Sequence, residues 1–269
     1  MRYTVVTSCS RSGWEAYGRR FMQTFAQYWP AEVELAVYSE DLKLQEAGNF
    51  DVRGRLVDLH AASASREFCA RHADDLEKHG RRQLPHHVGW TDKKKREGYN
   101  FRYDAVRFAK KVFAIEAAAQ GLDGRLFWLD MDVVTFAPVP LALLERMLPA
   151  EAALSCLDRG ELYHSECGFV GYNLEDPECR RFIAEFAALY ATDTVFGLQE
   201  WHDSWVFDSL RRKLGVLAWK IPHNSRSQPF INSDLGKYMD HMKGSSKERG
   251  RTKPELMVAG HRHAYWGRP

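Results

Sequence analysis

Segments typical of β-strands alternate with segments typical of α-helices through the first half of the chain, and this order restricts the fold more than any other feature. The strand-like runs, rich in β-branched and aromatic residues, are YTVVTS near the N-terminus, EVELAVYS at 32–39, GRLVDLH at 54–60 and RLFWLDMDVVTF at 125–136. Strands that alternate with helices usually form a largely parallel sheet with helices on both faces. We therefore expect an α/β fold with a mostly parallel central sheet.

The strongest helical pattern is YDAVRFAKKVFAIEAAAQG at 103–121, where apolar residues recur every three or four positions. Its expected buried stripe consists of Phe108, Val112, Ile115 and Ala119. Its basic residues, among them Lys111, are expected to lie off that stripe. Two later helices are predicted from their ends: DPECRRFIAEFAALY begins with Asp176 as N-cap, and DSWVFDSLRRKLG ends at Gly215. Further strands are expected in AALSCLD, CGFVGYNL and VLAWKIP.

The bulk properties are those of an ordinary globular protein. The chain has 269 residues and a net charge of +2, so composition alone does not indicate a nucleic-acid or membrane-surface binder. No run approaches the roughly 18 apolar residues that a membrane span requires, and the N-terminus lacks the apolar region of a signal peptide. The five cysteines are odd in number and include no Cys-x-x-Cys, so we expect reduced thiols in a cytoplasmic protein.

Two aspartates interrupt the apolar run FWLDMDVVTF at 127–136, where a buried strand should avoid charge. Ligands of open α/β sheets bind beyond the carboxyl ends of the strands, and Asp130 and Asp132 fall at such an end. Because side chains alternate along a strand, both carboxylates would project to one side and repel each other unless a cation lies between them. Mg²⁺ or Mn²⁺ with a bound diphosphate would satisfy both. The alternative is that they are solvated turn residues or helix caps.

This motif resembles the strand-end Asp-x-Asp of metal-dependent glycosyltransferases with the A-type nucleotide-sugar-binding fold. A second stretch, HMKGSSK at 241–247, is similar to the C-terminal motif of the retaining glycogenin-like and lipopolysaccharide galactosyltransferase group. The resemblance implies that His241 is the third metal ligand, and that Gly244 and Lys247 meet the diphosphate. That group usually continues with Pro-Trp, whereas this chain has Glu248-Arg249.

The same resemblance implies further contacts to the donor and acceptor. A basic residue ahead of the aspartates would contact the nucleotide sugar, and both Arg102 and Arg107 are candidates. The loop after the first strand would lie beneath the base or ribose, and its candidate contacts are Thr7, Ser8 and Ser10. If the enzyme inverts configuration, Asp203 or Glu200 would be the general base on the acceptor hydroxyl. If it retains configuration, as the resemblance favours, Asp203 would instead position a substrate.

The resemblance thus predicts a single Rossmann-like glycosyltransferase domain over 1–269. Residues 1–136 would form a nucleotide-binding half, and 137–269 an acceptor-side half with the metal and phosphate loop. The donor would be a nucleotide diphosphate sugar held with Mn²⁺ or Mg²⁺, and the acceptor a glycan, protein, small molecule or nucleic acid. The long polar segments 81–102 and 223–255 would close over the donor and shape the acceptor site.

Two other interpretations stay open at this point. Basic residues at 93–96 and 243–253, with aromatic residues nearby, could bind a nucleic-acid strand, either as the main function or as the acceptor of the transfer. A metal-dependent nucleotidyltransferase would also use paired aspartates, but it should lack the late His-x-x-Gly-x-x-Lys.

Overall fold

A seven-stranded sheet forms the centre of the computed structural model, which describes residues 1–41, 54–81, 98–161 and 163–267. The sheet order is β3-β2-β1-β4-β7-β6-β8. The strands are β1 Tyr3–Cys9, β2 Val33–Ser39, β3 Gly54–Asp58, β4 Arg125–Leu129, β6 Leu154–Leu157, β7 Glu166–Asn173 and β8 Ala218–Lys220. Strands β1 to β4 run parallel to one another, β7 is antiparallel to β4 and β6, and β8 is parallel to β6. The predicted mixed α/β fold with a mostly parallel sheet is confirmed.

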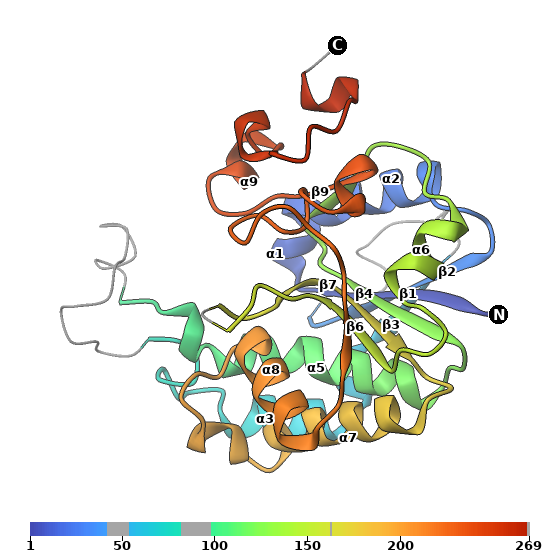
Figure 1. Ribbon diagram of the computed structural model, residues 1–269. Helices are drawn as coiled ribbons and strands as arrows, with labels where there is room; N and C mark the ends of the chain where they lie inside the picture. The colour runs from blue at the N-terminus through green and yellow to red at the C-terminus, as the bar shows by residue number, and fades with distance from the viewer. Residues whose placement is uncertain (42–53, 82–97, 162, 268–269) are drawn as a thin grey trace.

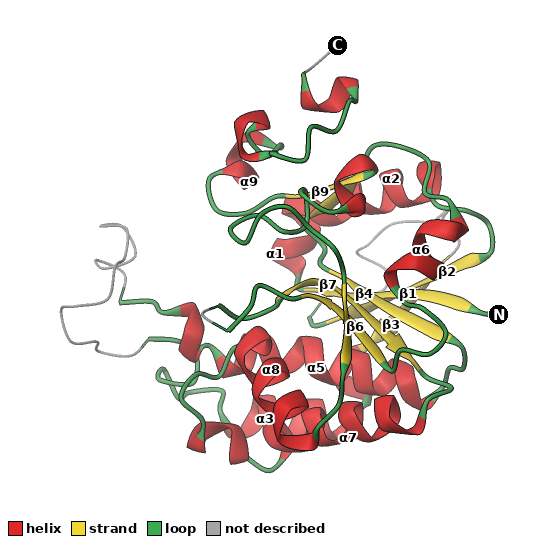
Figure 2. Ribbon diagram, viewed as in Figure 1, coloured by secondary structure: helices red, strands yellow, loops and turns green. Residues whose placement is uncertain are grey.

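Helices cover both faces of this sheet (Figures 1 and 2). The lower layer contains α3 Ser63–Arg71, α5 Ala105–Gln120, α7 Pro177–Ala191 and α8 Asp203–Leu214. The upper layer contains α1 Arg11–Gly13, α2 Arg19–Tyr28 and α6 Leu141–Met147, with α9 Ser246–Arg249 further out. None of the helices in the described ranges combines the length and apolar character that crossing a lipid bilayer requires.

Each face of the sheet has its own apolar core, because successive side chains of a strand point to opposite faces. Val6 packs in the lower core, while its neighbour Val5 packs in the upper one. The C-terminal segment closes the upper core with Trp266, which is completely buried and donates its indole N–H to the carbonyl of Gly236 at 3.1 Å. The tail is therefore packed against the fold as part of the upper layer.

The predicted helix ends agree with the structure. The Asp176 side chain accepts the backbone N–H of Glu178 at 2.7 Å and caps α7. Gly215 follows α8 in the left-handed region, with φ of 70°. One expectation for α5 is wrong: Lys111 is buried, with only 8% of its surface exposed. It lies three residues after Phe108 and four before Ile115, so it continues the apolar stripe.

The order of the sheet creates a binding edge. The chain proceeds from β1 to β2 and β3 on one side, and later places β4 on the other side of β1. In open α/β sheets, ligands bind at such a reversal, beyond the carboxyl ends of the strands. Ser10, Glu40 and Asp130 each directly follow one of the parallel strands β1, β2 and β4.

A small second sheet brings the C-terminal motif to this edge. Strand β5, Val133–Thr135, pairs antiparallel with β9, Met239–His241. In their register Val133 lies opposite His241. The pairing therefore fixes His241 beside the turn that carries the two aspartates.

Candidate active site

A cavity of about 1280 Å³ lies at this binding edge of the sheet, where the strand order reverses. Ser10, Glu40 and Asp130, the residues that follow three parallel strands, all line it. Known ligand pockets are roughly 300–1,000 Å³, so this cavity has room for more than one drug-sized molecule. Its described lining includes seven Lys or Arg side chains and six Asp or Glu side chains, which makes it strongly polar and highly charged.

Asp130, Asp132 and His241, hereafter the Asp–His cluster, lie close together in the lining of this cavity. One potential ligand atom from each residue lies within 4.8 Å of the others. The Nε2 atom of His241 is 3.2 Å from Asp132 Oδ1 and 3.5 Å from Asp130 Oδ2. The two carboxylates point toward one place, as predicted, but alternation along a strand is not the reason. Both aspartates lie in the tight turn between β4 and β5, and this turn directs them.

Lysine ammonium groups neutralise these carboxylates in the described structure. Lys247 Nζ lies 2.5 Å from Asp132 Oδ2, and Lys111 Nζ lies 3.2 Å from Asp130 Oδ1. Burial alone would raise the pKa of Asp132, but the charges of His241 and Lys247 hold that pKa well below its usual range. Asp132 Oδ1 is buried and makes no hydrogen bond of acceptable geometry, although His241 Nε2 is near. Two carboxylates, one imidazole nitrogen and an unsatisfied oxygen fit a divalent cation such as Mn²⁺ or Mg²⁺.

A buried carboxylate that the sequence interpretation missed orients His241. Glu166 Oε1 lies 2.8 Å from His241 Nδ1, which leaves Nε2 facing the two aspartates. A carboxylate on the outer ring nitrogen is the usual support of a metal-binding histidine. Burial favours the neutral imidazole, but Asp132 and Glu166 raise the pKa of His241 to about 9. Burial opposes the charge of Glu166 too, yet Lys243 and His241 lower its pKa to about 2.

The His241 ring fits only because residue 168 has no side chain. A Cβ atom added to Gly168 would lie 2.3 Å from His241 Cε1, far inside van der Waals contact. We expect Gly168→Ala to displace the ring and to weaken Mn²⁺ binding by about 10–100-fold, the loss typical of a disturbed metal-site support. Isothermal titration calorimetry on the purified variant measures this change.

Gly197→Ala is the matched control, because a Cβ there meets no atom within 4 Å. It should bind Mn²⁺ like the unmodified protein. Unchanged Mn²⁺ affinity in a correctly folded Gly168→Ala protein would show that the position of His241 does not matter for the ion.

Lys111 is the second residue that the sequence interpretation missed. From the buried side of α5, its Nζ reaches Asp203 Oδ2 at 2.7 Å, Asp130 Oδ1 at 3.2 Å and the carbonyl of Cys167 at 2.6 Å. Trp128 donates its indole N–H to the same Asp130 oxygen at 2.6 Å. Lys111 thus connects Asp130 with Asp203. Its place on the apolar stripe of the helix was the signal that could have identified it.

The two candidate general bases occupy different positions. Asp203, the first residue of α8, lines the cavity and pairs with Lys111. Burial would raise the pKa of Asp203, but the adjacent Lys111 and His202 hold it well below its usual range. Glu200 is not among the described lining residues, but it contacts two of them, Arg102 at 3.1 Å and His202 at 2.9 Å.

Some of the candidate donor contacts line the cavity and others do not. Ser8 and Ser10 line the cavity, whereas Thr7 is fully buried in β1 and is not part of the described lining. Arg102 and Arg107 both line the cavity, so its geometry does not separate them.

Several basic side chains of 243–253 contact other groups of the protein. Lys243 Nζ lies 2.6 Å from Glu166, Lys247 binds Asp132, and Arg251 donates to the carbonyl of Tyr265 at 2.7 Å. Gly244 turns the chain between the two lysines, with φ of 52°, and is not among the described lining residues. The other basic stretch, 93–96, lies outside the described residues, as does most of 81–102.

Comparison with known proteins gives matches among solved structures. No model of a known protein family matches the chain, and the comparison with curated proteins found no match. The apo form of mouse xyloside xylosyltransferase 1 matches with a TM-score of 0.48 and 11% identity, over 82% of this chain and 85% of that one. Two structures of the glycosyltransferase GlyE from Streptococcus pneumoniae match with TM-scores of 0.45 and 0.46 at 12% identity, over 82% and 81% of this chain. The chain aligns with only 45% of the GlyE chain.

Proposed function

We propose that this protein is a glycosyltransferase that moves a sugar from a nucleotide diphosphate sugar to an acceptor hydroxyl, with Mn²⁺ or Mg²⁺ as cofactor. The observation that carries this proposal is the Asp–His cluster, which is assembled beside Lys247 at the carboxyl ends of β1 and β4. A nucleotide placed at this edge would have its base near Ser8 and Ser10 and its diphosphate near the cluster.

The residues of the cluster have complementary roles in this proposal. Asp130, Asp132 and His241 would hold the ion, which when bound would offset the negative charge on the leaving diphosphate. Lys247, now paired with Asp132, has a side chain that is 29% exposed and would turn to a phosphate oxygen. Glu166 and Lys111 would keep His241 and Asp130 in place, so that the carboxylates and imidazole need no reorganisation when the donor arrives.

The state of Asp203 supports retention of configuration. A general base works best when its pKa lies near the working pH, whereas Lys111 and His202 keep the pKa of Asp203 far below it. We therefore assign Asp203 the role of positioning Lys111 and the acceptor side of the cavity. The division into a nucleotide-binding half at 1–136 and an acceptor-side half at 137–269 is part of this proposal.

A thermal-shift screen tests the proposed donor class. A nucleoside diphosphate or its sugar should raise the melting temperature only together with Mn²⁺ or Mg²⁺. At 100 times its Kd a ligand stabilises by about 2.7 kcal/mol, which corresponds to a shift of about 5 °C for a chain of this size. Nucleoside monophosphates with the same metal are the control, because they lack the diphosphate that the cluster would bind.

Two outcomes would overturn the proposal in favour of the alternatives. Stabilisation by nucleoside triphosphates alone, with release of pyrophosphate, would indicate a nucleotidyltransferase. Binding of DNA or RNA with a steep salt dependence, and no response to nucleotide sugars or metal, would indicate a nucleic-acid-binding protein.

A further inference from the structure

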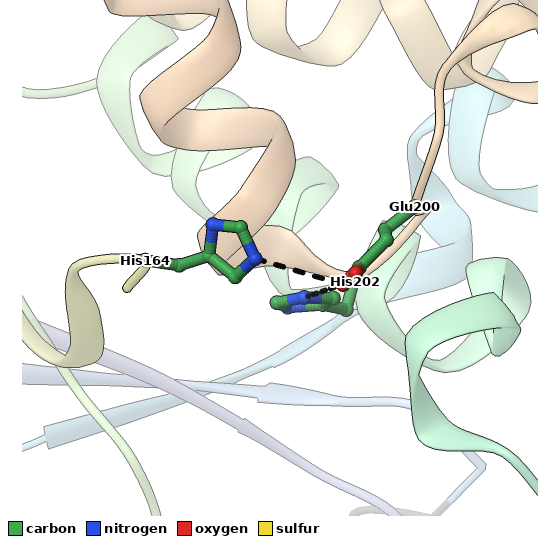
Figure 3. A group of neighbouring side chains, drawn as sticks. All are labelled: His164, Glu200 and His202. Atoms are coloured by element: carbon green, nitrogen blue, oxygen red, sulfur yellow. Dashed lines mark hydrogen bonds and ion pairs between the residues drawn. The ribbon is translucent and has the colours of Figure 1, made fainter. Parts of the chain in front are cut away.

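A second group of possible metal ligands lies apart from the Asp–His cluster. It consists of His164, just before β7, and of Glu200 and His202, just before α8; we name it the His–Glu cluster (Figure 3). Figure 3 shows both imidazole rings directed at the Glu200 carboxylate. Glu200 and His202 are 6% and 5% exposed, whereas the His164 side chain is 35% exposed.

The spacing of the three donor atoms suits a small divalent ion. His202 Nε2 lies 2.9 Å from Glu200 Oε2, and His164 Nε2 lies 3.7 Å from the same oxygen. All three donor atoms lie within 4.8 Å of one another. Tetrahedral Zn²⁺ with ligands at about 2.0–2.1 Å separates its ligand atoms by about 3.3 Å, which falls between the two measured distances.

The surroundings of Glu200 resemble those of a ligating carboxylate. Arg102 donates to the other oxygen of Glu200 at 3.1 Å, which leaves Oε2 facing the two imidazoles. The Nδ1 atom of His202, on the side away from Glu200, faces Asp203 Oδ1 at 3.9 Å, which is within ion-pair distance but too long for a hydrogen bond. Carboxylates behind a ligating histidine and hydrogen bonds to a ligating carboxylate are the common outer support of a metal.

Hydrogen bonding alone leaves this cluster incomplete. Only one of the two histidines is close enough to bond Glu200, since 3.7 Å exceeds a hydrogen bond. Within the part of the chain that the structure describes, His164 makes no hydrogen bond. A cation between the three donor atoms would engage His164 as well as the buried pair.

We propose that His164, Glu200 and His202 bind Zn²⁺, or a transition metal of similar preference, at a site separate from the Asp–His cluster. Two imidazoles and one carboxylate favour Zn²⁺ and other late first-row transition metals, while the two aspartates of the Asp–His cluster suit Mg²⁺ or Mn²⁺. His164 and His202 line the cavity, so a remaining coordination position is open to water or to a polar group of a bound molecule. The proposal concerns binding alone and does not depend on the glycosyl transfer proposed above.

Co²⁺ is the probe for this second site, because its visible absorption reports tetrahedral ligation by protein donors. The purified protein is stripped of metal and titrated with Co²⁺ in a large excess of Mg²⁺, which keeps the Asp–His cluster occupied although Co²⁺ binds imidazole-containing sites more tightly than Mg²⁺ does. We expect one equivalent to bind and to be displaced by Zn²⁺. His164→Ala should weaken Co²⁺ binding by at least about 100-fold, since loss of an outer support alone costs about 10–100-fold.

Matched variants distinguish Co²⁺ bound at the His–Glu cluster from Co²⁺ bound elsewhere on the protein. His60→Ala removes a partly buried histidine near α3 and should leave Co²⁺ binding unchanged. Asp132→Asn should also keep it, because Asp132 belongs to the other cluster. His164 is partly exposed, so its removal should not unfold the chain, and Glu200→Gln provides a second test of the same site.

The proposal is overturned if the Mg²⁺-saturated protein takes up no Co²⁺ or Zn²⁺. It is equally overturned if His164→Ala and Glu200→Gln both bind Co²⁺ as tightly as the unmodified protein. Failure of the nucleotide-sugar screen would not affect either result, since neither measurement uses a nucleotide.

Discussion

Asp132→Asn is expected to eliminate metal-dependent turnover of the nucleotide sugar while the protein stays folded. The substitution keeps the size of the side chain but removes the charge of a carboxylate that faces His241 at 3.2 Å and Lys247 at 2.5 Å. Metal ions supply several kcal/mol of charge stabilisation in such reactions. We expect the hydrolysis or transfer rate to fall at least about a thousand-fold, or about 4 kcal/mol. The donor identified by thermal shift serves as substrate, with product release followed at saturating Mn²⁺.

Asp123→Asn is the control for this substitution. Its side chain is 91% exposed and forms an ion pair with Arg180. Asp123 is not among the described residues that line the cavity. Both variants should have the circular dichroism of the unmodified protein, and Asp123→Asn should keep its turnover. If Asp132→Asn turns over the substrate as fast as the unmodified protein, Asp132 does not take part in metal binding.

Among the proposed single substitutions, Lys111→Met is expected to lower the free energy of unfolding most. The ammonium group is buried between Asp203 at 2.7 Å and Asp130 at 3.2 Å. Burial would lower the pKa of Lys111, but both carboxylates raise it well above its ordinary value, so the lysine is charged. Removing one partner of a buried ion pair leaves an uncompensated charge and costs about 3–5 kcal/mol. Urea unfolding followed by tryptophan fluorescence would show this as a lower midpoint with an unchanged slope.

Two further variants identify the cause of that loss. Lys213→Met removes an exposed lysine from the last turn of α8 and should change the unfolding free energy by less than about 0.5 kcal/mol. Lys111→Met combined with Asp203→Asn should recover part of the lost stability, because one of the two carboxylate charges left without the lysine is then absent. If the double variant is as unstable as the sum of the single ones, the lysine stabilises by packing and not by charge.

The sequence predicted the regular elements well because their signals are local. The run at 125–136 contained β4 and β5, Asp176 capped α7, and Gly215 ended α8. Caps, left-handed glycines and apolar periodicity all act within a few residues, so they can be read without tertiary contacts. Lys111 was misplaced because the cost of burying its charge is offset by two carboxylates 19 and 92 positions further along the chain, in the turn after β4 and on α8.

Only some residues of the candidate site were predicted, again because the sequence shows local motifs and does not show long-range contacts. Asp130, Asp132, His241 and Lys247 were singled out from two short motifs, and the structure brings them together. Glu166, His164 and His202 carried no comparable local signal, and Glu200 was singled out for a different role. Their significance arises from distances to residues on other elements, such as the 2.8 Å between Glu166 and His241.

By itself, the sequence determined an α/β chain with two aspartates at the end of a buried strand and a histidine–lysine motif near the C-terminus. Only the tertiary structure decided how these parts meet. The β5–β9 pairing placed His241 beside the aspartate turn, and the absence of a side chain at Gly168 made room for its ring. Local propensity fixes where elements begin and end, whereas the charge balance of a buried site depends on contacts between segments far apart in the chain.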